Sequence, residues 1–332
     1  MSDSSFPCFQ PHPLLRNGHL QTIAGAYLNT SCVIPPAQKH RLRLADGDTL
    51  ILHDNCPSNW QPNDSSVILA HGLTGAHSTS YMVRTAAKLL ARGCRTFRLD
   101  LRGCGDGFLL AQGLGHAGRS EDLFSAVQKV TAICPDSSLT CVGFSLSGNM
   151  LLKMLGERPQ ALPNQLENAV SISAPIDTRL CSLTMQKGIS RFYGTKFVRE
   201  LMRQLRKKQA AISGFNKERL YPTPRTMFEF DDRVTAPLSG FENAAAYYRE
   251  ASSVRVVEHI TTRTLVVSAV DDPLVPVRTY QEAKFSTAVT LDIQQHGGHL
   301  GFVSAKKVQS DRRWLDQRIT EWIMPKRNSR KI

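Results

Sequence analysis

The sequence lacks the hydrophobic segments that mark membrane-spanning and secreted proteins. No run of 18 apolar residues occurs among the 332, so no transmembrane helix is predicted. The first fifteen residues have no basic start followed by an apolar stretch, so we expect no secretory signal peptide. These absences favour a soluble protein, and we expect a cytoplasmic location.

The sequence also lacks the motifs that bind common cofactors and metals. It contains no Walker phosphate loop, no cluster with zinc-ligand spacing and no C-x-x-C pair among its eight cysteines, which we expect to be reduced thiols. Two stretches, 103–108 and 113–118, resemble the G-x-G-x-x-G pattern. Neither follows the first strand of a dinucleotide-binding unit, so turn glycines explain them better. We therefore expect no cofactor and no metal.

Acidic residues are few relative to basic ones. Lysine and arginine number 41 against 28 aspartates and glutamates, which gives a formal charge of +13. Such a charge favours anionic partners, including nucleic acid, acidic lipid headgroups or a charged substrate. Beyond charge, the sequence shows no nucleic-acid-binding motif and few aromatics near its basic stretch at 187–219, so we expect no nucleic-acid partner.

From about residue 40, short apolar strands alternate with amphipathic helices, which is typical of a mostly parallel sheet with helices on both faces. The predicted strands lie at 40–54 (a hairpin), 67–70, 94–101, 138–143, 168–174, 262–270 and 288–294, and the predicted helices at 80–92, 120–132, 147–157, 276–285 and 311–324. We interpret the chain as a single α/β domain, with an N-terminal extension (1–39) and a core (40–176 and 259–332).

Residues 177–258 interrupt this alternation with a basic, helical insertion. Insertions at the carboxyl ends of strands surround the ligand crevice of open sheets, so we expect a helical cap over the active site. Within it, 196–211 places Phe197, Leu201 and Leu205 on one helical face and basic residues on the others. Two interpretations stay open for this helix. It contacts an anionic membrane, or it docks on the domain with its charges in water.

The strongest local pattern is a strand, a tight turn and a helix around Ser145. The turn runs from Gly143 to Gly148, and small residues let the backbone pass close to a strained nucleophile. The usual pattern is G-x-S-x-G, whereas this chain has Ser147 at the last glycine position. Ser145 is the predicted nucleophile.

A serine hydroxyl needs a base that is oriented by an acid, and in this fold the chain order is Ser, Asp or Glu, then His. After the strand at 262–270 come Asp271 and Asp272, and we prefer Asp272 because it lies four residues before Pro276. After the strand at 288–294 come His296 and His299. We prefer His299, because two glycines before it let the loop turn toward Ser145.

Two backbone amides are needed to stabilise the oxyanion that forms during acyl transfer. Leu146, directly after the nucleophile, should supply one, and Leu73, in the loop after the strand at 67–70, should supply the other. His71 in that loop is an alternative base, but we favour a structural role in which it holds the loop by hydrogen bonds.

Several further motifs resemble one branch of a known family. They are NGHLQTI (17–23), HGLTGAHSTSY (71–81), LRGCG (101–105), HAGRSEDL (116–123), GFSLSGN (143–149), FDDRVTAPLSGFENAAAYYREAS (230–252), DDP (271–273) and GGHLGF (298–302). Over nearly its whole length the chain resembles the YheT-like branch of the α/β-hydrolases, which is related to eukaryotic abhydrolase-domain lipases. The resemblance implies the triad Ser145, Asp272 and His299.

The sequence therefore predicts a serine hydrolase that cleaves carboxylic esters, with a small-molecule ester or a lipid as substrate. Thioesterase, peptidase and acyltransferase activity on the same triad stay open, as does a non-catalytic binding protein on a hydrolase scaffold. The last alternative is disfavoured, because such proteins typically lose a triad residue and this chain keeps all three.

Overall fold

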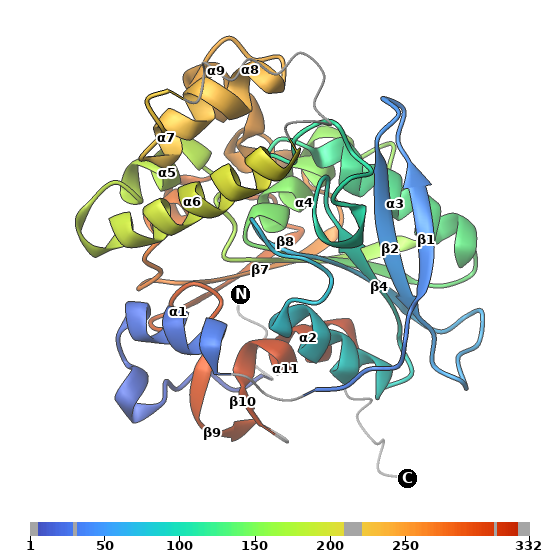
Figure 1. Cartoon of the computed structure of the whole chain (residues 1–332). Coiled ribbons are helices and arrows are strands. Elements are labelled where there is room, and N and C mark those ends of the chain that lie inside the picture. Colours follow the sequence, from blue (N-terminus) through green and yellow to red (C-terminus); the bar gives the residue numbers. More distant parts are fainter. Residues whose placement is uncertain (1–5, 29–31, 209–220, 309–310, 325–332) are drawn as a thin grey trace.

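The computed structural model describes residues 6–28, 32–208, 221–308 and 311–324. Its centre is an eight-stranded sheet in the order β1-β2-β4-β3-β5-β6-β7-β8 (Figure 1). The strands are β1 (Gln38–Arg43), β2 (Thr49–Asn55), β3 (Ser66–Ala70), β4 (Arg95–Asp100), β5 (Leu139–Phe144), β6 (Leu166–Ile172), β7 (Arg263–Ala269) and β8 (Val289–Gln294). The predicted hairpin forms the antiparallel pair of β1 and β2, and β2 pairs antiparallel with β4. From β4 to β8 all neighbours are parallel.

Helices cover both faces of the sheet, as the sequence predicts. One face carries α2 (Ser80–Leu90) and α11 (Trp314–Ile323), and the other carries α3 (Ser120–Ile133) and α4 (Leu146–Glu157). Side chains alternate along a strand, so neighbouring residues enter different cores. Leu69 of β3 packs in the core under α2 and α11, whereas Ile68 packs in the core under α3 and α4. The fold is that of an α/β-hydrolase.

The segment between β6 and β7 lies over the carboxyl ends of the parallel strands (Figure 1). Its helices are α5 (Thr178–Thr184), α6 (Arg191–Lys208), α7 (Met227–Phe230), α8 (Ala236–Leu238) and α9 (Ala244–Ala251), with short turns at η3 (Gly188–Ser190), η5 (Asp231–Thr235), η6 (Ser253–Arg255) and η7 (Val257–His259). Leu205 of α6 is buried in a small core with residues of α7. The apolar face of the predicted basic helix is therefore docked on the protein. Residues 209–220 of the predicted cap lie outside the described residues.

Two terminal elements were not predicted from the sequence. The N-terminal extension contains η1 (Pro13–Leu15) and α1 (Gly18–Tyr27), and residues near the C-terminus form a hairpin of β9 (Val303–Val308) and β10 (Asp311–Arg313). The predicted helix at 311–324 was wrong in its first turn, since α11 begins at Trp314. Tertiary contacts decide this, because the Gln21 side chain bonds both the amide and the carbonyl of Val303.

Two smaller features complete the fold. The predicted helix at 276–285 is shorter, as α10 (Arg278–Glu282), and η2 (Gly105–Gly107) follows β4. Within the described ranges, no helix is both long enough and apolar enough to span a bilayer. All eight cysteines are free thiols.

Asn149 joins the nucleophile helix α4 to two segments from other parts of the chain. Its side-chain amide donates to the carbonyls of Ala117 (2.9 Å) and Ala251 (2.8 Å), and its oxygen accepts from the amide of Ser253 (2.9 Å). The side chain is fully buried. Two of these bonds hold the end of the inserted segment against the helix that follows Ser145, and the third holds the loop before α3 against it.

We predict that Asn149→Ala destabilises the fold, because it leaves three buried backbone groups without a partner. The expected loss is at least about 3 kcal/mol, since each of the three unsatisfied buried groups costs about 1–3 kcal/mol. Chemical denaturation measures this loss. Asn63→Ala, at an exposed loop position, serves as control and should leave the unfolding midpoint unchanged. Equal midpoints for the two variants would contradict the role assigned to Asn149.

Candidate active site

Ser145 occupies a strained turn between β5 and α4. Its φ of 51° and ψ of −113° lie where few residues other than glycine are found, which costs about 1–3 kcal/mol. The turn is held by the Ser145 amide, which donates to the carbonyl of Ile172 (2.8 Å). A Cβ at Gly143 would lie 2.3 Å from the carbonyl oxygen of Ser147, so only glycine fits there. The turn lifts the Ser145 side chain out of the strand.

The structure brings the three predicted triad residues together. The Nε2 atom of His299 lies 2.9 Å from the Oγ of Ser145, and its Nδ1 lies 2.9 Å from the Oδ2 of Asp272. The other oxygen of Asp272 accepts from the amides of Leu274 (2.8 Å) and Val275 (3.0 Å), which orients the carboxylate. A carboxylate accepts at Nδ1, so that nitrogen carries the proton and Nε2 is free to accept from the serine hydroxyl.

The neighbouring residues Asp271 and His296 form a separate pair. The His296 Nδ1 lies 3.2 Å from the Asp271 carboxylate, which also accepts from the amide of Gly298 (2.9 Å). Asp271 therefore fastens the glycine loop that carries His299. The sequence alone does not indicate this contact, since it shows only that Asp271 is adjacent to Asp272.

Helix α1 packs directly behind the His299 loop, and sequence reasoning missed this role. The Thr22 Oγ1 accepts from the His299 amide (2.9 Å) and donates to the carbonyl of Gly18 (2.7 Å). A Cβ at Gly18 would lie 1.8 Å from the carbonyl oxygen of Asp271, so the helix approaches as closely as backbone allows. The sequence feature that could have indicated this role is the motif at 17–23, which resembles the YheT-like branch but does not by itself indicate a contact with His299.

His71 has the structural role that we favoured. It is fully buried, its Nδ1 donates to the carbonyl of Gly72 (2.8 Å), and its Nε2 accepts from the amide of Leu101 (3.2 Å). Burial lowers the pKa of this imidazole, so it is neutral. The Ser147 hydroxyl donates to the His71 carbonyl (2.6 Å), which explains why serine fits at the usual glycine position. Ser147 thereby ties α4 to the loop that carries Leu73.

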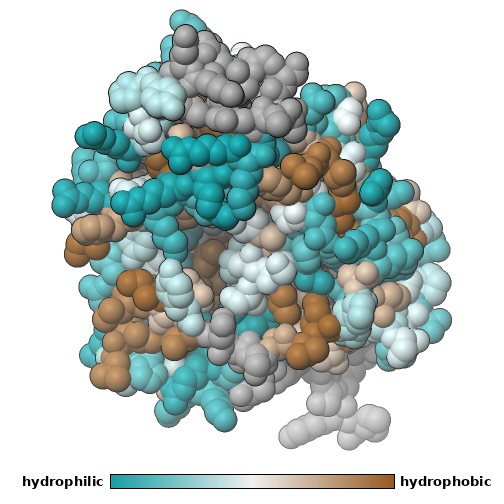
Figure 2. All heavy atoms as spheres, viewed as in Figure 1, coloured by the Kyte–Doolittle hydropathy of each residue, from teal (hydrophilic) through white to brown (hydrophobic). Residues whose placement is uncertain are grey.

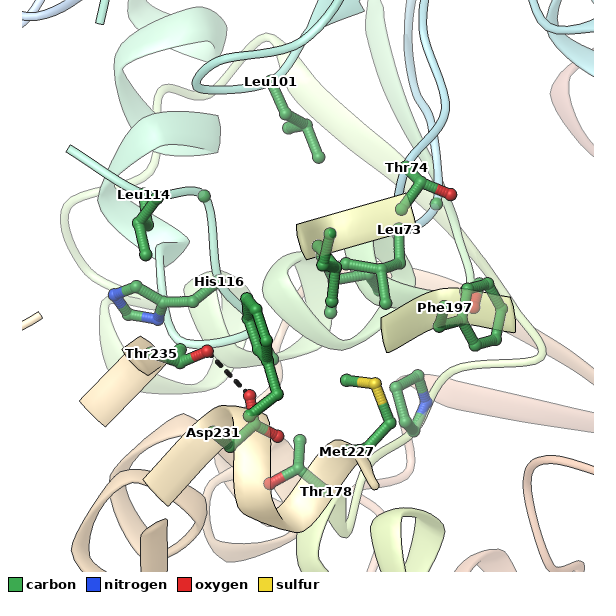
Figure 3. A pocket seen from close by; sticks show the side chains of 18 of the residues that line it. Leu73, Thr74, Leu101, Leu114, His116, Thr178, Phe197, Met227, Asp231 and Thr235 are labelled. Atoms are coloured by element: carbon green, nitrogen blue, oxygen red, sulfur yellow. Dashed lines mark hydrogen bonds between the residues drawn. The ribbon is translucent and has the colours of Figure 1, made fainter. Parts of the chain in front are cut away.

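A cleft lies between the inserted helices and the sheet (Figure 3). Ser145 and His299 both line it, as do the two predicted oxyanion residues, Leu73 and Leu146. Most of its wall is apolar. The inserted segment contributes Met185, Phe197, Leu201, Leu205, Met227 and Phe230. A cleft with an apolar wall beside Ser145 and His299 accommodates an ester with an apolar chain.

Polar groups gather at one part of the cleft wall. The buried Asp231 accepts from the hydroxyls of Thr235 and Tyr248, each at 2.8 Å, and burial raises its pKa to about 6 (Figure 3). Burial also lowers the pKa of His116 to about 3, so this ring is neutral. These groups can bond to a polar part of a ligand.

The described residues include one group whose atoms could hold a metal ion. His53, His77, Asp100 and Asp106 bring four potential ligand atoms within 4.8 Å of one another. Hydrogen bonds already account for the cluster, because both imidazoles lie 2.9 Å from the Asp100 carboxylate, which also accepts from two backbone amides. We therefore interpret the cluster as structural, with hydrogen bonds to Asp100 that hold the loop after β3 against the end of β4.

Known proteins of the α/β-hydrolase fold are similar to this chain. The family model for the alpha/beta hydrolase fold matches residues 65–305. The chain is 29% identical to the putative esterase YheT of Escherichia coli over 96% of this chain and 94% of that protein. It is 27% identical to a monoacylglycerol lipase of Saccharomyces cerevisiae, over 77% of this chain and 58% of that protein.

A solved structure of similar fold is the esterase Pf2001 of Pyrococcus furiosus. Its TM-score is 0.55 at 16% identity, and the match covers 89% of this chain and 96% of that one. This likeness concerns the fold alone. The chain belongs to the α/β-hydrolase family, and along nearly its whole length it is similar to the YheT-like branch.

Proposed function

We propose that this protein hydrolyses carboxylic esters, with Ser145 as nucleophile, His299 as general base and acid, and Asp272 as the acid that orients the imidazole. The observation that carries the proposal is the continuous hydrogen-bonded chain from Ser145 Oγ through His299 to Asp272, at 2.9 Å for each contact. Relatives named as an esterase and a lipase favour ester hydrolysis over thioesterase, peptidase or acyltransferase activity.

Acylation follows from these positions. The Ser145 oxygen attacks the ester carbonyl while His299 Nε2 takes its proton, and Asp272 stabilises the imidazolium. The negative charge that develops on the carbonyl oxygen is stabilised by the amides of Leu146 and Leu73. Leu146 is the first residue of α4, so its N–H has no acceptor within the helix. The imidazolium then protonates the leaving alcohol.

Deacylation repeats the sequence with water. His299 removes a proton from a water molecule, whose oxygen attacks the acyl-enzyme carbonyl, and the collapse of this second intermediate releases the carboxylic acid and returns the proton to Ser145. The protein's own side chains carry every proton in this scheme. A cytoplasmic location stays a prediction from the sequence.

We predict that Ser145→Ala abolishes both fluorophosphonate labelling and turnover of p-nitrophenyl esters, because it removes the attacking oxygen. Mass spectrometry of the labelled wild-type protein should locate the adduct on Ser145. Ser147→Ala is the matched control and should keep the label, since Ser147 bonds to the His71 carbonyl and is fully buried. An adduct on Ser147 would overturn the assignment of the nucleophile.

Asp272→Asn should lower kcat by about 10⁴-fold, because an asparagine stabilises the wrong imidazole tautomer. Asp271→Asn should have a far smaller effect, since Asp271 contacts His296 and a loop amide and does not contact His299. Steady-state kinetics on one soluble ester compares the two variants, and their circular dichroism spectra control for folding. The reverse ranking would mean that Asp271 is the triad acid.

A second proposal concerns an anionic membrane surface. Helices α1 and α6 lie side by side, joined by a hydrogen bond from Lys196 to the Tyr27 hydroxyl (2.8 Å). Large apolar side chains are exposed near this junction. Figure 2 shows a hydrophobic patch over α1, below the hydrophilic band of α6. The exposed residues are Leu20, Ile23, Tyr27, Leu28, Ile189 and Phe192.

Basic side chains of α6 border this apolar patch. A groove along α6 is lined by Arg191, Lys196, Arg199 and Arg203, together with Thr74 and Phe197, which also line the catalytic cleft. Apolar residues beside basic ones are the composition of a surface that lies on anionic lipid. An ester drawn from such a bilayer would reach the cleft beside Thr74.

We predict that Arg191→Gln/Arg199→Gln weakens binding to anionic vesicles by roughly 30-fold, because each basic residue near such a surface contributes about 1 kcal/mol. Vesicle sedimentation at low salt measures the binding, and added salt should weaken it. The control, Arg41→Gln/Arg43→Gln, removes equal charge from β1. Similar losses in both variants, or equal binding to anionic and neutral vesicles, would contradict a membrane-facing surface.

A further inference from the structure

Lys208 differs from the basic residues that precede it on α6. Arg206 and Lys207 are exposed, whereas Lys208, the last residue of the helix, is only 3% exposed and lines the catalytic cleft. The expectation that the basic residues of 196–211 lie away from the apolar face is wrong for Lys208. The reason is helical geometry, since Lys208 follows Leu205 by three residues and Leu201 by seven and shares their inward face.

The Lys208 ammonium has no anionic partner within the described part of the chain. By contrast, Arg102, at the same end of the cleft, pairs with Asp46, Asp48 and Asp122. Asp48 acts electrostatically on Lys208, but it is already engaged, because its carboxylate binds Arg102 and two backbone amides. Among the described residues, Lys208 is thus a buried cation whose charge no carboxylate compensates.

The space around the ammonium is shaped by Gly103 and Phe108. Gly103 has a φ of +63°, and a Cβ there would lie 2.3 Å from Lys208 Nζ, so a larger residue would displace the ammonium. The Phe108 ring centroid lies 5.7 Å from Nζ. Burial lowers the pKa of Lys208, because desolvation disfavours the charged form. An anion bound in the cleft would offset this cost.

The inward face of α6 runs from apolar residues to this cation. The residues of this face that line the cleft are Phe197, Leu201, Leu205 and Lys208. At a rise of 1.5 Å per residue, the distance along the helix from Phe197 to Lys208 is about 16 Å. A ligand that lies along it would place an apolar chain against the first three side chains and a negative group against the fourth. Ser145 and His299 line the same cleft, so the ligand that fits is an ester.

We propose that Lys208 binds an anionic group, a carboxylate or a phosphate, that the ester substrate carries away from its scissile bond. This inference rests on the proposed hydrolase function and names the substrate class. The ammonium would form a charge-assisted hydrogen bond with the anion in a poorly hydrated site, where such bonds are strong. Lys208 would then select substrates by a charged end as well as by an apolar chain.

Two pairs of substrates test the proposal and separate the two sources of charge. The first pair is the mono-p-nitrophenyl ester of a straight-chain dicarboxylic acid and the p-nitrophenyl ester of the monocarboxylic acid of equal length. The second pair is dihexanoyl phosphatidic acid and dihexanoylglycerol. Wild-type enzyme should prefer the anionic member of at least one pair by about tenfold in kcat/KM. The preferred pair identifies the group as a carboxylate on the acyl side or a phosphate on the alcohol side.

The variants show whether Lys208 causes the preference. Lys208→Met should abolish the preference by lowering kcat/KM for the anionic esters about tenfold more than for the neutral ones, and Lys208→Arg should keep most of the preference. Lys207→Met removes the same charge from the exposed neighbour and should change nothing. If Lys208→Met does not fold, a second measurement tests the proposal. Inhibition of the wild-type enzyme by the dicarboxylic acid is then compared with inhibition by the monocarboxylic acid of equal length, and the dicarboxylic acid should inhibit more strongly.

Three results would overturn the inference. In the first, the wild-type enzyme prefers the anionic member of neither substrate pair. In the second, Lys208→Met lowers kcat/KM equally for neutral and anionic esters. In the third, Lys207→Met loses as much of the preference as Lys208→Met does. Failure of the proposed function looks different. In that case the wild-type enzyme would turn over none of the four substrates faster than Ser145→Ala does.

Discussion

The strained turn at Ser145 is the constraint on which the rest of the site depends. Close packing between the backbones of β5 and α4 maintains its positive φ. Gly143 lies against the Ser147 carbonyl, and the Ser145 amide donates to the Ile172 carbonyl. Without that packing the turn would relax to an ordinary conformation, and Oγ would leave the cleft. The packing of the buried sheet against α4 therefore supplies the energy that keeps the Ser145 side chain in the cleft.

The base depends on contacts from distant parts of the chain. His299 lies on a loop of glycines that would be loose by itself. Asp271 fastens this loop from the end of β7, Asp272 orients the imidazole, and Thr22 of α1 bonds the His299 amide. An N-terminal helix thus serves as part of the support for a residue near the other end of the chain.

Most of the core and the triad could be predicted from the sequence, because both are encoded locally. Apolar runs specify buried parallel strands, and the turn at 143–148 needs small residues within six positions. The order of Ser145, Asp272 and His299 follows from the strand ends that carry them. Helix α1, the β9–β10 hairpin and the first turn of α11 could not be predicted, because long-range contacts such as Gln21 with Val303 decide them.

What the sequence determined by itself is the fold class and the three residues proposed to react, since these follow from periodicity and from short motifs. Only the tertiary structure decided which charges face water and which face the cleft. The basic stretch of α6 has one composition but two environments, with Lys207 exposed and Lys208 buried beside Gly103. Helical rotation and the docking of Leu205 make that difference, and no count of charges along the chain contains it.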